Sequence, residues 1–62
     1  MEDADDVEKT AAEYLARLGT AAVEDLRERA EMAAADGDDF SAAAWTDIAD
    51  AAKRLLDKRY SI

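Results

Sequence analysis

The chain is 62 residues long, and its sixteen acidic and eight basic side chains give it a net charge of −8. This length allows one small domain, and the absence of cysteine and histidine excludes disulfides and the usual ligands of zinc and haem. The surplus of acids argues against nucleic acid or an anionic membrane as a direct ligand, because both attract cationic surfaces.

The start of the sequence does not have the pattern of a targeting signal. Its first six residues are mostly acidic, whereas a signal peptide begins with basic residues and continues with an apolar stretch. No apolar run approaches the roughly 20 residues that a membrane-spanning helix needs. We therefore expect a cytoplasmic protein with a single helical domain over residues 1–62, in which residues 1–4 form a flexible arm.

Two glycines mark the expected helix ends, and the chain contains no proline. Gly19 follows Leu18 and precedes Thr20, which is the order of a glycine that ends one helix and a residue that caps the next. Gly37 stands in the same way before Asp38. The pattern predicts an all-α fold with helices at about residues 5–18, 21–36 and 39–59.

The first expected helix carries a single apolar stripe. Its members recur at i, i+4, i+7, i+8 and i+11, and they are Val7, Ala11, Tyr14, Leu15 and Leu18. If this helix continued across Gly19, the stripe of the next segment would lie about 100° out of phase. The phase change favours a bend at Gly19. Because glycine costs a helix only about 1 kcal/mol, one long helix in a hairpin is the alternative.

The second expected helix has a narrower stripe, formed by Val23, Leu26, Ala30 and Ala33. Met32 stands off this stripe. It either fills a gap beside the core, is tolerated at the surface, or belongs to an adaptable binding surface.

The third expected helix has the strongest apolar pattern. One row is formed by Phe40, Ala44, Ile48, Ala51 and Leu55, and it is widened by Trp45, Ala52 and Leu56. If Ser41 caps this helix, Phe40 and Trp45 form a hydrophobic staple. If Asp38 caps it, Phe40 is the first core residue. A further interpretation is that Trp45 anchors a partner, because aromatic side chains dominate interface energetics.

The core predicted from these stripes is thin. Sixteen of the hydrophobic residues are alanine, and apart from Met1 only fourteen are larger. Burying a large apolar side chain contributes roughly 1.5–3 kcal/mol, while ordering each residue costs on the order of 1.5 kcal/mol, so a lone chain lies near balance. We expect a small three-helix bundle, or a helical hairpin with a bent first arm, that dimerises into a larger bundle.

No set of residues predicts catalysis or metal binding. Ser41 and Ser61 have no evident activating base. The acids of residues 36–39 do not follow the EF-hand order, since Ala43 stands where the closing glutamate would be, and an interhelix turn with a helix cap explains them. We expect no enzyme activity, no catalytic residue, no metal and no cofactor.

The expected function is contact with other proteins. We predict an adaptor or regulator that forms a homodimer through alanine-rich faces of the second and third helices and binds an unidentified protein. The residues expected to make contact are Phe40, Trp45, Ile48, Ala52, Leu55 and Leu56. The alternatives are an acidic inhibitor that imitates nucleic acid on a basic protein, and a structural subunit of a larger assembly. A salt-loving host would explain the acidity equally well.

Overall fold

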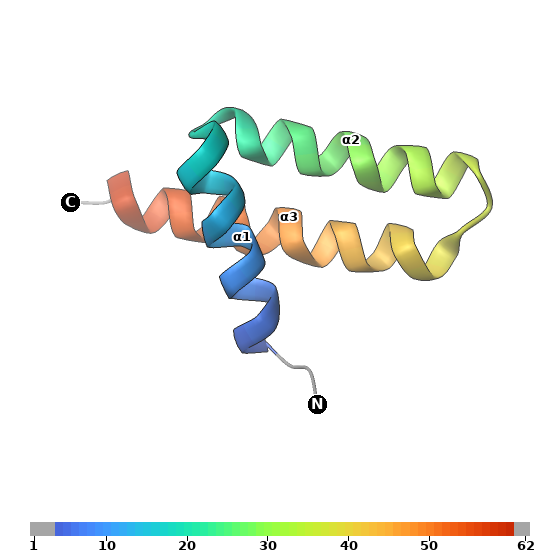
Figure 1. Cartoon of the computed structure of the whole chain (residues 1–62), viewed down its shortest axis with the longest axis horizontal. Coiled ribbons are helices and arrows are strands. Elements are labelled where there is room, and N and C mark those ends of the chain that lie inside the picture. The colour runs from blue at the N-terminus through green and yellow to red at the C-terminus, as the bar shows by residue number, and fades with distance from the viewer. Residues whose placement is uncertain (1–3, 61–62) are drawn as a thin grey trace.

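The computed structural model describes residues 4–60, which form three helices (Figure 1). These are α1 (Ala4–Leu18), α2 (Ala21–Ala35) and α3 (Asp39–Tyr60). α2 and α3 lie side by side as an antiparallel hairpin, and α1 crosses this hairpin at the end away from the 36–38 turn (Figure 1). The predicted all-α, three-helix bundle is confirmed, and the alternative of one long helix across Gly19 is wrong.

The observed helix bounds differ from the expected ones by a single residue. α1 begins at Ala4, inside the segment expected to be a flexible arm, whose residues 1–3 lie outside the described part of the chain. α2 ends at Ala35, and α3 extends to Tyr60. Differences of this size are usual at helix ends.

Gly19 ends α1 in a left-handed conformation, with φ of +64°. Its N–H donates to the carbonyl of Leu15 at 2.8 Å, the bond that closes a helix on a left-handed residue. Thr20 does not cap α2 with its side chain, contrary to the prediction. Its backbone already has helical angles (φ −64°, ψ −22°), whereas a capping side chain needs an extended backbone to reach the next turn.

Gly37 ends α2 in the same conformation, with φ of +81°, and here two bonds close the helix. The N–H of Gly37 donates to the carbonyl of Ala34 at 3.0 Å, and the N–H of Asp38 donates to that of Ala33 at 2.9 Å. This pair of bonds is the Schellman motif, which satisfies carbonyls that the helix end would otherwise leave free. The motif turns the chain directly into α3.

Asp38 caps α3. Its Oδ1 accepts a hydrogen bond from the N–H of Ser41 at 3.1 Å, and its carbonyl accepts one from the N–H of Ala42 at 3.0 Å. Ser41 is therefore inside the helix, and the staple of Phe40 and Trp45 that required Ser41 as the cap is wrong. The hydroxyl and the N–H of Ser41 together hold the pKa of the Asp38 carboxyl below its ordinary value.

The lowered pKa of Asp38 predicts a pH-dependent cap. The ionised carboxylate stabilises the helix above the unfolded-state pKa of about 3.9, and this stabilisation is lost as the pH falls through the lower pKa of the folded state. Asp38→Asn keeps an acceptor at the cap but does not titrate. Thermal melts between roughly pH 7 and pH 3 should show the Tm advantage of the native chain over this variant shrinking below about pH 4. Parallel curves would contradict the assignment.

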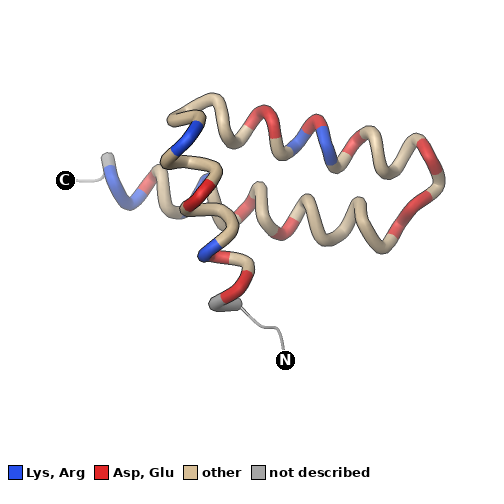
Figure 2. Tube along the Cα trace, viewed as in Figure 1, with Lys and Arg blue, Asp and Glu red and all other residues tan. Residues whose placement is uncertain are grey.

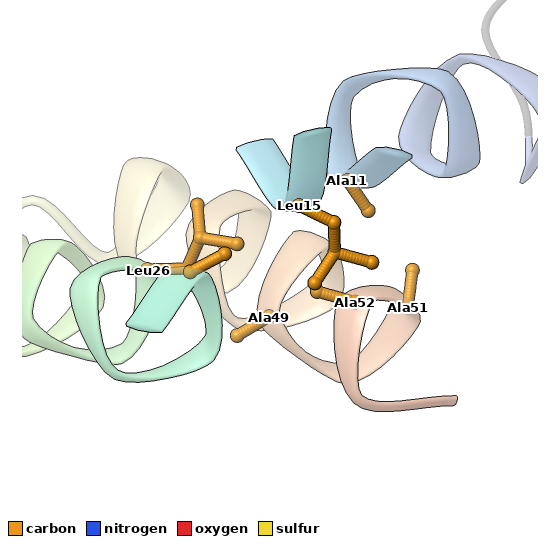
Figure 3. Packing of buried hydrophobic residues seen from close by; sticks show 7 residues of the cluster. Ala11, Leu15, Leu26, Ala49, Ala51 and Ala52 are labelled. Atoms are coloured by element: carbon orange, nitrogen blue, oxygen red, sulfur yellow. The ribbon is translucent and has the colours of Figure 1, made fainter. Parts of the chain in front are cut away.

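The core lies where the three helices meet (Figure 3). Its buried residues are Ala11, Leu15, Ala22, Leu26, Ala49, Ala51 and Ala52. Only Leu15 and Leu26 among them are larger than alanine. Partly buried side chains pack around this centre, namely Val7, Tyr14, Val23, Trp45, Ile48, Leu55 and Leu56. Small side chains at the crossing allow the helices to approach closely.

Candidate interaction surface

The apolar row of α3 is buried along only part of its length. Ala51, towards the C-terminal end, is 1% exposed, and Ile48 and Leu55 are partly buried. Ala44 is exposed, and Phe40 is 86% exposed. Because these residues recur every three or four positions, they share one side of the helix. The change in burial along the row therefore reflects what covers it.

α1 covers only the C-terminal half of this row. Ala11 and Leu15 of α1 lie over Ala51 and Ala52 of α3 (Figure 3). Grooves lined by Ala12 and Leu15 together with Leu55 place α1 beside this part of α3. Since α1 crosses the hairpin at one end (Figure 1), the row beside the 36–38 turn has no helix over it among the described residues. We call Phe40 and Ala44, with Met32 across the turn, the open face.

Met32 and Phe40 stand on opposite sides of the interhelix turn. Met32 lies in the last turn of α2 and is 67% exposed, and Phe40 lies in the first turn of α3. With Asp38 as the cap, Phe40 was expected to be the first core residue, and this expectation is wrong. The reason is that the core residues of α3 begin at Trp45, one turn further along, where α2 and α1 both reach the helix.

The other residues expected to make contact take different positions. Trp45, Ile48, Leu55 and Leu56 are partly buried against the chain's own core. Ala52 is fully buried, so its methyl group supports the packing of α1 on α3 and is not accessible from outside. Only Phe40 of the six is fully exposed, and the assignment of this set to a partner stays a prediction.

Trp45 follows Ala44 in α3, and one residue from each of the other two helices packs on its ring. The rings of Tyr14 and Trp45 meet edge to face, with 6.2 Å between centroids and 83° between planes. The guanidinium of Arg29 lies 5.7 Å from the Tyr14 ring centroid and 5.3 Å from that of Trp45. Sequence spacing missed this cluster because its members come from α1, α2 and α3.

Arg29 is held over the two rings by an acid on its own helix. Its Nε donates to Oδ2 of Asp25 at 2.9 Å, an ion pair at the i,i+4 spacing. This bond, with the charge of Asp25 and the neighbouring Tyr14, raises the pKa of Arg29 above its ordinary value. The guanidinium therefore stays a fixed cation at the border between the core and the open face.

Charge is distributed unevenly along the hairpin (Figure 2). Residues 30–50, which we call the acidic tip, contain six acids and no lysine or arginine: Glu31, Asp36, Asp38, Asp39, Asp47 and Asp50. The remainder of the chain holds ten acids (16 − 6) against all eight bases. The open face thus lies within a part of the hairpin that carries acids and no bases.

A second surface lies between α2 and α3. This shallow groove, which we call the alanine groove, is lined by Arg27, Ala30, Glu31, Thr46, Ala49 and Asp50. No residue of α1 is among them. Small side chains therefore form its floor, and charges of both signs form its rim.

The acids of the structure do not gather as metal ligands. No group of three or more Asp or Glu side chains that could hold an ion is found within the described part of the chain. Among residues 4–60, no helix combines the length and the apolar character needed to cross a membrane. Among the acids at the interhelix turn, Asp38 acts as a helix cap.

Comparisons of the chain with protein-family models, with curated proteins and with solved structures give no match.

Proposed function

We propose that this chain is a small helical protein–protein interaction module, an adaptor or regulator of a larger protein. The observation that supports this is the uneven burial of one apolar row, in which Ala51 is covered by α1 while Phe40 is 86% exposed. A single exposed apolar residue is ordinary. Here the exposed phenylalanine continues a core row and is accompanied by Ala44 and Met32, which is the pattern of a contact surface.

We also propose that the module is a homodimer, joined through the alanine groove. The floor of this groove is small, so a second hairpin can approach closely. Its rim offers Arg27 and Asp50, a base and an acid that a twofold interface can pair between copies. The apolar area added by pairing supplements a core in which, among the residues whose burial the structure describes, only Leu15 and Leu26 are both buried and larger than alanine.

Light scattering on the purified chain at low micromolar concentration tests the homodimer. The expected mass is twice the 6.8 kDa of one chain. Thr46→Glu, an exposed residue on the groove, should give a monomer because it sets a new acid against the partner. Ala43→Glu, exposed on the same helix but not lining the groove, is the matched control and should stay dimeric.

The outcomes separate the two surfaces. A native chain that is monomeric would overturn the homodimer. If Phe40→Ser were monomeric while Thr46→Glu remained dimeric, the second copy would occupy the open face and not the alanine groove. Circular dichroism of each variant shows that its helices are intact.

A second candidate function is an acidic inhibitor that occupies a basic, nucleic-acid-binding protein. The acidic tip favours it, because six acids without a base imitate a run of phosphates. Such a complex would weaken steeply with added salt and would not depend on Phe40. An interaction module that uses its apolar face would lose binding when Phe40 is replaced, at any salt concentration.

A further inference from the structure

We infer that the open face binds a cationic amphipathic helix of another protein, laid across the α2–α3 hairpin beside α1. This inference rests on the proposed interaction function and adds the chemistry of the partner. Two observations support it: an apolar row whose end no helix in the described part of the chain covers, and the acidic residues around that end.

We expect the bound segment to be a helix because a helix, α1, already packs on the other half of the same row. α1 lies on Ala51 and Ala52 with an apolar stripe that includes Ala11 and Leu15. Ala44 follows Phe40 by four positions and Ile48 follows Ala44 by four more, so the row continues without interruption beyond α1. A second helix with leucine or similar residues at i, i+3, i+4 and i+7 packs on this extension as α1 packs on its other half.

The occupant is cationic because of the acids around the face. Asp39 adjoins Phe40 in the sequence, and Asp47 follows Phe40 by seven residues, which places it on the same side of α3. Asp36 and Asp38 lie at the turn between Met32 and Phe40. No lysine or arginine occurs from residue 30 to residue 50 to offset them. Lysine or arginine on one flank of the apolar stripe of a partner would meet these carboxylates.

The same charges disfavour a second copy at this face. Two chains that met through their open faces would set Asp39 and Asp47 of each copy against those of the other with no base to pair them, whereas the alanine groove carries Arg27 beside Glu31 and Asp50. The basic residues of the chain are elsewhere, with four of them (Lys53, Arg54, Lys58 and Arg59) at the far end of α3. A contact that joins that end of one copy to the tip of the next without its reciprocal is heterologous, and such contacts build rings or open filaments.

The test uses two designed helical probes of about 18 residues, long enough to hold a helix when bound. Both have the same leucine face, and one carries lysine and the other glutamate on the remaining positions. Neither contains an aromatic residue, so the fluorescence of Trp45, the single tryptophan of the chain, reports binding at the border of the open face. The full chain is titrated with each probe at low and at high salt.

We expect the lysine probe to bind saturably and the glutamate probe not to bind. Phe40→Ser should weaken the lysine probe by about tenfold or more, the loss typical of a central aromatic anchor. Asp39→Asn with Asp47→Asn should weaken it by roughly two- to tenfold. Glu13→Gln with Glu24→Gln removes the same charge far from the tip, and should leave the affinity unchanged.

Three results would overturn the inference, and they differ in what they leave standing. Equal binding of both probes, each lost in Phe40→Ser, would keep the proposed interaction function and remove the selection for a basic partner. If the lysine probe bound Phe40→Ser as tightly as the native chain, and bound neither at high salt, binding would depend on charge alone, as the acidic inhibitor requires. If neither probe bound, the open face would lose its role in the proposed function as well, while the homodimer would still be judged by light scattering.

Discussion

Leu26→Ala is expected to leave the chain largely unfolded at room temperature or to lower its Tm by at least about 10 °C. Leu26 is the largest fully buried side chain, with no exposed surface. Removing a buried leucine side chain costs about 2–5 kcal/mol, which includes the cavity left behind. A domain of 62 residues has a total stability of roughly 3–9 kcal/mol. The loss is therefore comparable to the whole stability, and a thermal melt followed by circular dichroism would measure it.

The matched control for this substitution is Leu18→Ala. Leu18 lies at the last position of α1 and is 44% exposed, so the same change of side chain removes much less buried area. The expected loss is below about 1 kcal/mol. Equal losses in the two variants would show that the core does not centre on Leu26.

The helices and their ends could be predicted from the sequence because the signals are local. Gly19 and Gly37 both have the positive φ that a helix-ending glycine adopts, and at Gly19 the apolar stripe also changes phase. The cap of α3 could not be decided from spacing, because Asp38 and Ser41 are both good capping residues. The Schellman motif at Gly37 decides it, since it delivers Asp38 to the start of the helix with its carboxylate beside the N–H of Ser41.

The candidate surface could be predicted only in part, because its extent depends on contacts between helices and not on local signals. Periodicity shows that Phe40, Ile48 and Leu55 share one side of α3, but it carries no information on how far along that side a neighbouring helix reaches. That distance depends on the crossing of α1, which short alanine side chains at Ala11 and Ala52 permit. The position of Arg29 over rings from two other helices is a tertiary arrangement as well.

Ala52→Leu tests the crossing that leaves the open face uncovered. Ala52 has no exposed surface and lies against Leu15 of α1 (Figure 3). Added methylene groups in a packed core cost typically about 1–3 kcal/mol, because neighbouring side chains or helices must shift. We expect a Tm lower by roughly 5–15 °C and a weaker near-ultraviolet signal from the Tyr14–Trp45 pair, which depends on the position of α1. Ala43→Leu, the same change at an exposed position of α3, should be nearly neutral.

The double variant Leu15→Ala with Ala52→Leu distinguishes crowding at this contact from a general effect of leucine in α3. It moves the larger side chain from α1 to α3 while keeping the total apolar volume of the pair. If the two residues fill one space, the double variant should be more stable than the sum of the single losses predicts, with a coupling of about 0.5–3 kcal/mol. Additive losses would mean that they do not share the contact. In that case, other contacts between α1 and α3 would determine how much of α3 stays uncovered.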